Sequence, residues 1–99
     1  MENQNYTSLY ISEKIEQSIM SRKLVNIKTS SFSLKGFILG YHYDIVLDKC
    51  YCEIWVKEAN KEIQLSKKNY LLLESSRIWF ILNESDEQIS ESALRYNDL

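Results

Sequence analysis

The sequence contains no proline and only two glycines, Gly36 and Gly40. This scarcity excludes collagen-like and linker-rich chains, which need both residues in quantity. It also contains only two cysteines, Cys50 and Cys52, and one histidine, which is too few for the paired ligands of a zinc site. We therefore expect reduced thiols that pack as small apolar groups, with no metal and no cofactor. A disulfide or a metal role for the cysteines is the less favoured alternative.

Long apolar stretches are also missing. No apolar run approaches the roughly 18 residues that a membrane-spanning helix requires. Residues 1–5 lack the basic and apolar regions of a secretion signal. These observations lead us to expect a cytoplasmic protein that does not enter a membrane.

The residues that are present are typical of a folded domain. The chain has 99 residues, of which 44% are hydrophobic, 12% aromatic and 26% charged. A disordered chain would be poorer in aromatic and β-branched side chains. A chain of this length suits one domain with one modest core, so residues 1–99 are expected to fold together.

Charge is distributed unevenly along the chain. Residues 21–79 carry ten Lys and Arg against six Asp and Glu, a net charge of +4. Residues 80–99 carry one Arg against five Asp and Glu, a net charge of −4. A basic middle followed by an acidic end is compatible with a surface that binds a polyanion, although an ordinary solvated surface gives the same pattern.

The spacing of apolar residues predicts one helix near the start. Ile11, Ile15 and Ile19 recur every four residues, which places them on one helical face. Ser12 is a suitable N-cap for a helix over residues 12–22. So short a helix must dock on another element to persist.

The middle of the chain changes to the alternation of β-strands. Apolar and polar residues alternate over 24–29, 37–43 and 50–57, with shorter apolar segments at 62–65, 70–73 and 77–82. The two glycines predict bulges or bends in the second strand. Ser85 and Gln88 form a candidate capping box for a last helix or acidic tail. We therefore predict an all-β small barrel of the Sm/SH3-like class over residues 23–75. It has five to six short antiparallel strands, an N-terminal helix and a C-terminal extension over 76–99.

One segment resembles a known motif. Residues 32–47, Phe-Ser-Leu-Lys-Gly-Phe-Ile-Leu-Gly-Tyr-His-Tyr-Asp-Ile-Val-Leu, resemble the first motif of the Sm-like superfamily, in the version found in the bacterial RNA chaperone Hfq. Gln64–Tyr70 is a weaker counterpart of the second motif. The resemblance covers residues 12–75. His42, Asp44 and Lys68 differ from the residues that the family has at the matching positions.

The resemblance implies a protein that binds single-stranded RNA and assembles as a homo-oligomer, in which strand four of one subunit pairs with strand five of the next. In such rings RNA contacts a loop after strand two and a loop before strand five. These positions match His42 and Tyr43 in the first loop and Lys67 and Lys68 in the second, and Gln17 lies on the helix that would line the ring. An aromatic ring supplies a surface for base stacking and lysine supplies phosphate contacts.

A second interpretation stays open. Trp55 and Trp79 are candidate anchors of a protein interface, since aromatic residues are enriched at interface hot spots. The chain would then be a protein-interaction barrel, such as a small inhibitor or adaptor from a mobile element, that binds no nucleic acid. In either case we expect no enzyme, because the sequence has no nucleophile motif, phosphate-binding glycine loop or paired carboxylates.

Self-association is predicted from the apolar segments 63–65 and 71–73, which suit pairing between subunits. The apolar residues 78–82 could instead cover the same edge within one chain and keep the protein monomeric.

Overall fold

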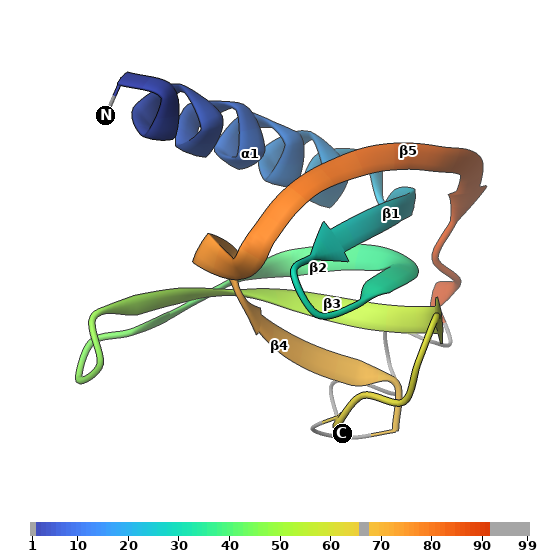
Figure 1. The fold of residues 1–99 in the computed structure, drawn as a ribbon. Coiled ribbons are helices and arrows are strands. Elements are labelled where there is room, and N and C mark those ends of the chain that lie inside the picture. Colours follow the sequence, from blue (N-terminus) through green and yellow to red (C-terminus); the bar gives the residue numbers. More distant parts are fainter. Residues whose placement is uncertain (1, 66–67, 92–99) are drawn as a thin grey trace.

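The computed structural model describes residues 2–65 and 68–91 of the chain. It contains helix α1 (Glu2–Ser21), the 3₁₀ turn η1 (Ser75–Arg77) and the strands β1 (Lys23–Thr29), β2 (Ser33–Asp44), β3 (Lys49–Ala59), β4 (Tyr70–Glu74) and β5 (Ile78–Gln88). The strands form one open antiparallel sheet in the order β4-β3-β2-β1-β5 (Figure 1). The prediction of a mostly β fold with an N-terminal helix is confirmed.

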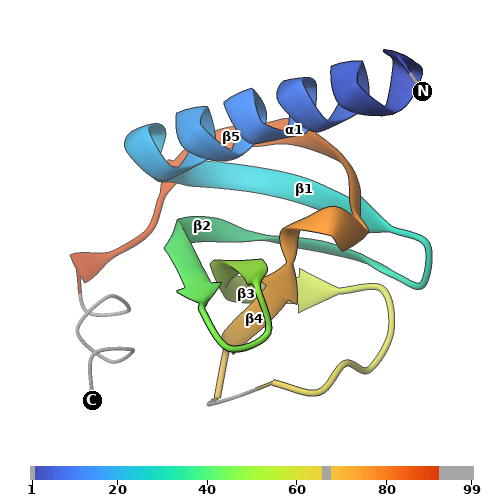
Figure 2. The same cartoon turned by 90° about the vertical axis from the view of Figure 1, so that its left-hand side faces the viewer.

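Helix α1 lies across the sheet above β1 and β5 (Figure 2). Ile11 and Ile15 enter the core from the helix, as their spacing predicted. The helix begins at Glu2, so the predicted start at Ser12 was wrong and Ser12 lies inside the helix. It ends where Arg22 adopts a left-handed backbone conformation (φ 56°) and its N–H reaches the Ser18 carbonyl at 3.0 Å.

The sheet is bent at two irregularities in the β2–β3 pairing, one at Lys35/Gly36 and one at Ile38/Gly40. A Cβ atom at Gly36 would lie 2.4 Å from the Trp55 carbonyl oxygen, so only glycine allows β3 to approach this closely. A Cβ atom at Gly40 would meet nothing within 4 Å. The bulges predicted from the two glycines are confirmed, and steric necessity applies at Gly36.

The core lies between α1 and the inward face of the bent sheet. Cys52, Ile54 and Val56 point inward from β3, as the alternation predicted, and all three are buried. The same cluster includes inward residues of every other strand and of α1, among them Val25, Ile27, Leu34, Ile38, Leu71, Leu73, Ile78 and Ile81. One continuous core therefore holds the helix and the sheet together.

One predicted strand was wrong. Glu62–Leu65 has no regular structure, although Ile63 and Leu65 pack against the core from the loop between β3 and β4. Ile45–Leu47 forms the turn between β2 and β3 and does not continue a strand. Tyr70–Glu74 is consequently the fourth strand of the sheet, and β5 is the fifth.

The end of the chain also differs from the prediction. Ser85–Gln88 belongs to β5 and is no helix-capping box. The Gln88 side-chain amide donates to the Ser21 carbonyl at 3.1 Å, and the Ile89 N–H donates to the Arg22 carbonyl at 3.2 Å. The end of β5 is therefore tied to the end of α1. Residues 92–99, where the predicted last helix would continue, lie outside the described residues. None of the helices in the described part is long and apolar enough to cross a membrane.

Candidate nucleic-acid interface

The structure brings the β2–β3 turn and η1 to the same end of the sheet. The Ser75 hydroxyl in η1 donates to the Cys50 carbonyl at 3.2 Å, and Cys50 is paired with Tyr43 across the hairpin. The Lys49 ammonium lies 3.8 Å from the Glu74 carboxylate, which joins the first residue of β3 to the last residue of β4. We refer to residues 42–51 and 75–77 together as the hairpin end.

Tyr43 presents an aromatic ring at the hairpin end, with 55% of the residue exposed. Its hydroxyl donates to the Asp48 carboxylate, and this bond raises the pKa of the phenol, which therefore stays protonated. The bond orients the ring and leaves its faces open to a stacking partner. His42 is exposed one residue earlier, with its ring tilted 49° to that of Tyr51 at 6.4 Å.

Arg77 adds a cation to the hairpin end. It is exposed, and its guanidinium lies 5.7 Å from the centroid of the Phe32 ring. Sequence reasoning missed Arg77 because the residue opens an apolar run and was counted as part of a strand. The preceding pair Ser75-Ser76, a turn-forming combination, was the signal that could have revealed a loop there.

The residues predicted to bind RNA are not all together within one chain. Lys68 precedes Asn69, whose carbonyl accepts from the Val56 N–H at 2.7 Å. Tyr43 lies opposite Cys50, and Cys50 precedes Val56 by six residues on β3. The two predicted sites are therefore roughly 20 Å apart along the strand. Lys68 lies in the β3–β4 loop and does not lead into the fifth strand. Gln17 is exposed on α1, and Lys67 lies outside the described residues.

The acidic segment at the end of β5 lies over the basic strands. Its carboxylates form ion pairs with lysines from three different strands: Asp86 with Lys23 at 3.2 Å, Glu84 with Lys35 at 3.0 Å and Glu87 with Lys57 at 2.6 Å. The basic middle and the acidic end, separate in the sequence, thus neutralise each other in part. Binding of a polyanion would therefore depend on the cations that remain, such as Arg77.

The two tryptophans have different environments. Trp55 is half-buried and packs against Phe37, with ring centroids 6.1 Å apart and planes 50° apart. Trp79 lies near the start of β5 and is 56% exposed. Of the two predicted protein anchors, Trp79 is the one available to a partner.

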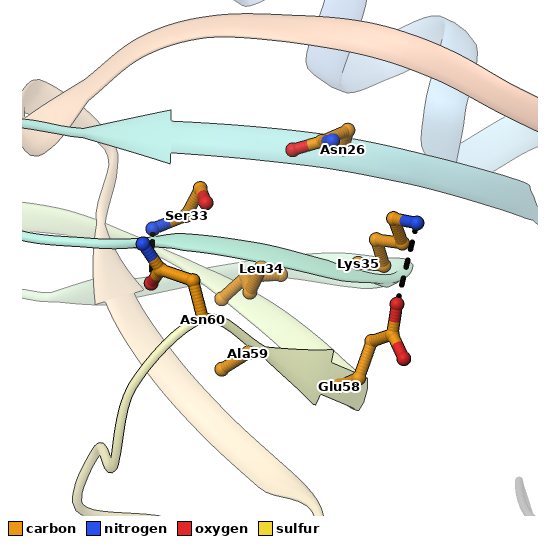
Figure 3. A pocket seen from close by; sticks show the side chains of 7 residues that line it. All are labelled: Asn26, Ser33, Leu34, Lys35, Glu58, Ala59 and Asn60. Atoms are coloured by element: carbon orange, nitrogen blue, oxygen red, sulfur yellow. Dashed lines mark hydrogen bonds and ion pairs between the residues drawn. The ribbon is translucent and has the colours of Figure 1, made fainter.

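A hollow of about 300 Å³ lies on the sheet at β1, β2 and β3 (Figure 3). It is lined by Asn26, Ser33, Leu34, Lys35, Glu58, Ala59 and Asn60. The Lys35 ammonium lies 3.3 Å from Glu58, and the Asn60 side-chain oxygen accepts from the Ser33 N–H at 3.0 Å. Bonds to Glu84 and Glu58 raise the pKa of Lys35. Most polar groups of this hollow already have partners within the protein.

No group of three or more His, Cys, Asp and Glu side chains could hold a metal ion within residues 2–65 and 68–91. No family model, curated protein or solved structure matches this chain.

Proposed function

We propose that this protein binds single-stranded RNA as an Sm-like, Hfq-like RNA-binding protein or RNA chaperone of the cytoplasm. The observation that carries the proposal is the Ser75–Cys50 hydrogen bond, which holds η1 beside the start of β3, directly after the β2–β3 turn. The β2–β3 turn and η1 are the loop after strand two and the loop before strand five, the two positions that contact RNA in the proteins this sequence resembles. Tyr43 would stack on a base and Arg77 would contact phosphate.

The proposed assembly is a homo-oligomer of small barrels, each of which is open between β4 and β5. β4 and β5 are the outer strands of the sheet, and each pairs with a single neighbour among the described strands. Exposed strand edges of this kind are templates for pairing with another chain. Joining β4 of one subunit to β5 of the next would remove both edges and bring several hairpin ends together. Repetition of a weak site around a ring would raise its avidity.

RNA titration tests the proposal. We expect labelled U-rich or A-rich RNA to bind at low salt, and the affinity to fall as salt rises. Tyr43→Ala should weaken binding by about 5- to 150-fold, the range expected for one lost stacking contact. Arg77→Gln should weaken binding and lower the salt slope by about 1.

Lys61→Gln is the matched control for Arg77→Gln. Lys61 is exposed beyond the opposite end of β3, so this variant should bind like the unmodified protein. Lys67→Ala with Lys68→Ala tests the predicted second loop separately. No binding below about 10 μM at low salt, or equal losses in Arg77→Gln and Lys61→Gln, would reject the proposed interface.

A protein-interaction module is the second candidate, because Trp79 is 56% exposed and the acidic end of β5 neutralises lysines on three strands. A protein interface anchored on Trp79 would tolerate salt and would be lost in Trp79→Ala. RNA binding through Tyr43 and Arg77 would weaken as salt rises and would persist in Trp79→Ala.

A further inference from the structure

We propose that the β2–β3 turn of one molecule docks on the outer face of β5 in a second copy of the chain. The apolar tip consists of Ile45, Val46 and Leu47. The β5 patch consists of Phe80 and Leu82 with the neighbouring Lys28 of β1. This contact uses the turn of the hairpin end but neither Tyr43 nor Arg77, and it uses side-chain surfaces in place of the strand edges invoked above.

The apolar tip lacks the residues that normally make a turn. Hairpin turns favour Gly, Asn, Asp and Pro, because these residues adopt turn conformations easily and remain solvated. Here Asp48 supplies the left-handed position of the turn (φ 52°), but the other turn residues, Ile45, Val46 and Leu47, are apolar and 82%, 92% and 57% exposed. Three consecutive branched side chains in water bring no stability to the monomer, which indicates a surface that is buried in a complex.

Local hydrogen bonds hold the tip in one conformation. The Asp44 carboxylate accepts from the Leu47 N–H at 3.1 Å, and the Asp48 carboxylate accepts from the Tyr43 hydroxyl. A preorganised turn loses less conformational freedom on binding than a flexible loop. The same two aspartates place negative charge at the base of the apolar tip.

The β5 patch has the complementary chemistry. Phe80 and Leu82 lie opposite Lys28 and Asn26 in the β1–β5 register and alternate with the buried Ile81, so both point outward. The Lys28 ammonium lies 5.7 Å from the centroid of the Phe80 ring. No carboxylate of the described residues forms an ion pair with Lys28. An apolar surface beside this cation suits an apolar tip that carries two carboxylates, and this charge complementarity favours a second copy as the partner.

The contact is proposed between two molecules. The β2–β3 turn projects away from the rest of the sheet at the lower left of Figure 1, whereas β5 arches over the top. The contact joins two different surfaces and is therefore head-to-tail, which allows a chain or ring of subunits. A three-residue tip buries less area than a standard interface, so we expect weak association with a Kd above about 1 μM.

Three aspartate variants with the same charge change test the docking. Val46→Asp removes the apolar tip, Leu82→Asp removes the β5 patch, and Met20→Asp is the control at an equally apolar residue of α1 that is 85% exposed. Sedimentation measurements across the expected Kd should give an average mass above 11.8 kDa for the unmodified protein and for Met20→Asp. Val46→Asp and Leu82→Asp should each remain monomeric.

The decisive measurement is the mixture of Val46→Asp and Leu82→Asp. Each variant keeps one intact surface, so the mixture should form a 1:1 dimer and nothing larger. A mixture that stays monomeric overturns the proposal, as does a Val46→Asp variant that assembles like the unmodified protein. The latter result would favour edge pairing of β4 and β5. Unmodified protein that stays monomeric also overturns the proposal. If this monomeric protein sediments with phosphatidylcholine vesicles, the apolar tip binds lipid and not a second copy.

Discussion

Gly36 is the position at which β3 leaves no room for a side chain on β2. The atom that a Cβ would meet is the Trp55 carbonyl oxygen, which belongs to the backbone and cannot move without displacing β3. The close approach lets the sheet bend around its core, so a single residue without a side chain affects the whole fold.

Replacing Gly36 by alanine should therefore lower the free energy of unfolding by about 1–3 kcal/mol, the usual cost of overpacking. Gly40→Ala is the matched control, since an added Cβ there meets nothing within 4 Å. It should be neutral or stabilise the protein slightly, because alanine loses less backbone entropy than glycine. Urea denaturation of both variants measures the difference, and equal midpoints would contradict the steric account.

Cys52 is a buried thiol whose state should depend on pH only at high values. Burial, followed by the nearby Cys50, raises the pKa of Cys52 from 9.0 to about 12. In the unfolded chain the thiol deprotonates near 9, so the folded state holds more protons between pH 9 and 12. Stability should consequently fall as pH rises above 9.

Iodoacetamide modification at constant pH tests the burial of the Cys52 thiol, which is the cause of its raised pKa. Cys50, which is partly exposed, should be alkylated well before Cys52 in the native protein. Both should react readily in denaturant. Equal native rates for the two cysteines would show that the β3 face is open to the reagent.

At the scale of elements, α1 is held to the sheet by a few buried side chains. Ile15 is buried within the core cluster, whereas Met20 on the same helix is largely exposed. The Ser18 hydroxyl is also buried, and it donates to the Lys14 carbonyl at 2.7 Å. This buried polar group therefore has a hydrogen-bond partner.

Truncation of Ile15 to alanine should cost about 2–5 kcal/mol of unfolding free energy, since it removes buried methyl groups and leaves a cavity. Met20→Ala should change stability by less than about 0.5 kcal/mol, as expected for an exposed position. Thermal or urea unfolding followed by circular dichroism measures both. A small effect at Ile15 would mean that the helix does not pack on the sheet as described.

At the scale of the whole molecule, helix and strands share one core. The cluster contains side chains from α1 and from all five strands. No described element therefore has a separate core that would stay packed after the other elements unfold. The link from the end of β5 to the end of α1 closes the structure further. These features favour a single cooperative transition.

The ellipticity at 222 nm, which reports the helix, and the tryptophan fluorescence, which reports the sheet, should therefore give the same urea midpoint. The Ile15→Ala variant should shift both midpoints together. A helix signal that is lost before the fluorescence changes would show that α1 unfolds separately.

The sequence alone determined the features that depend on local patterns. Alternation along residues 50–57 specified which side chains of β3 point inward, and the four-residue spacing of Ile11 and Ile15 specified the buried face of the helix. The two glycines marked the bends, and at Gly36 no other residue type would allow the close approach of β3. These properties follow from the geometry of a single element.

Only the tertiary structure decided which apolar segments become strands. The residues 62–65 have the composition of a strand but lie in a loop, while the acidic residues 84–88 form the end of β5. A strand needs a hydrogen-bonding partner distant in sequence, and ion pairs such as Glu84–Lys35 and Glu87–Lys57 exist only after such a partner is found.

The candidate site divides in the same way. Tyr43 was predicted from its place in a motif, which is a local property. The place of Arg77 in η1, at the same end of the sheet, was not predicted, because it depends on the turn η1 and on the pairing of β4 with β3. The same pairing puts Lys68 toward the other end of β3. Residue types were thus readable in the sequence, whereas their distances were set by the long-range register of the sheet.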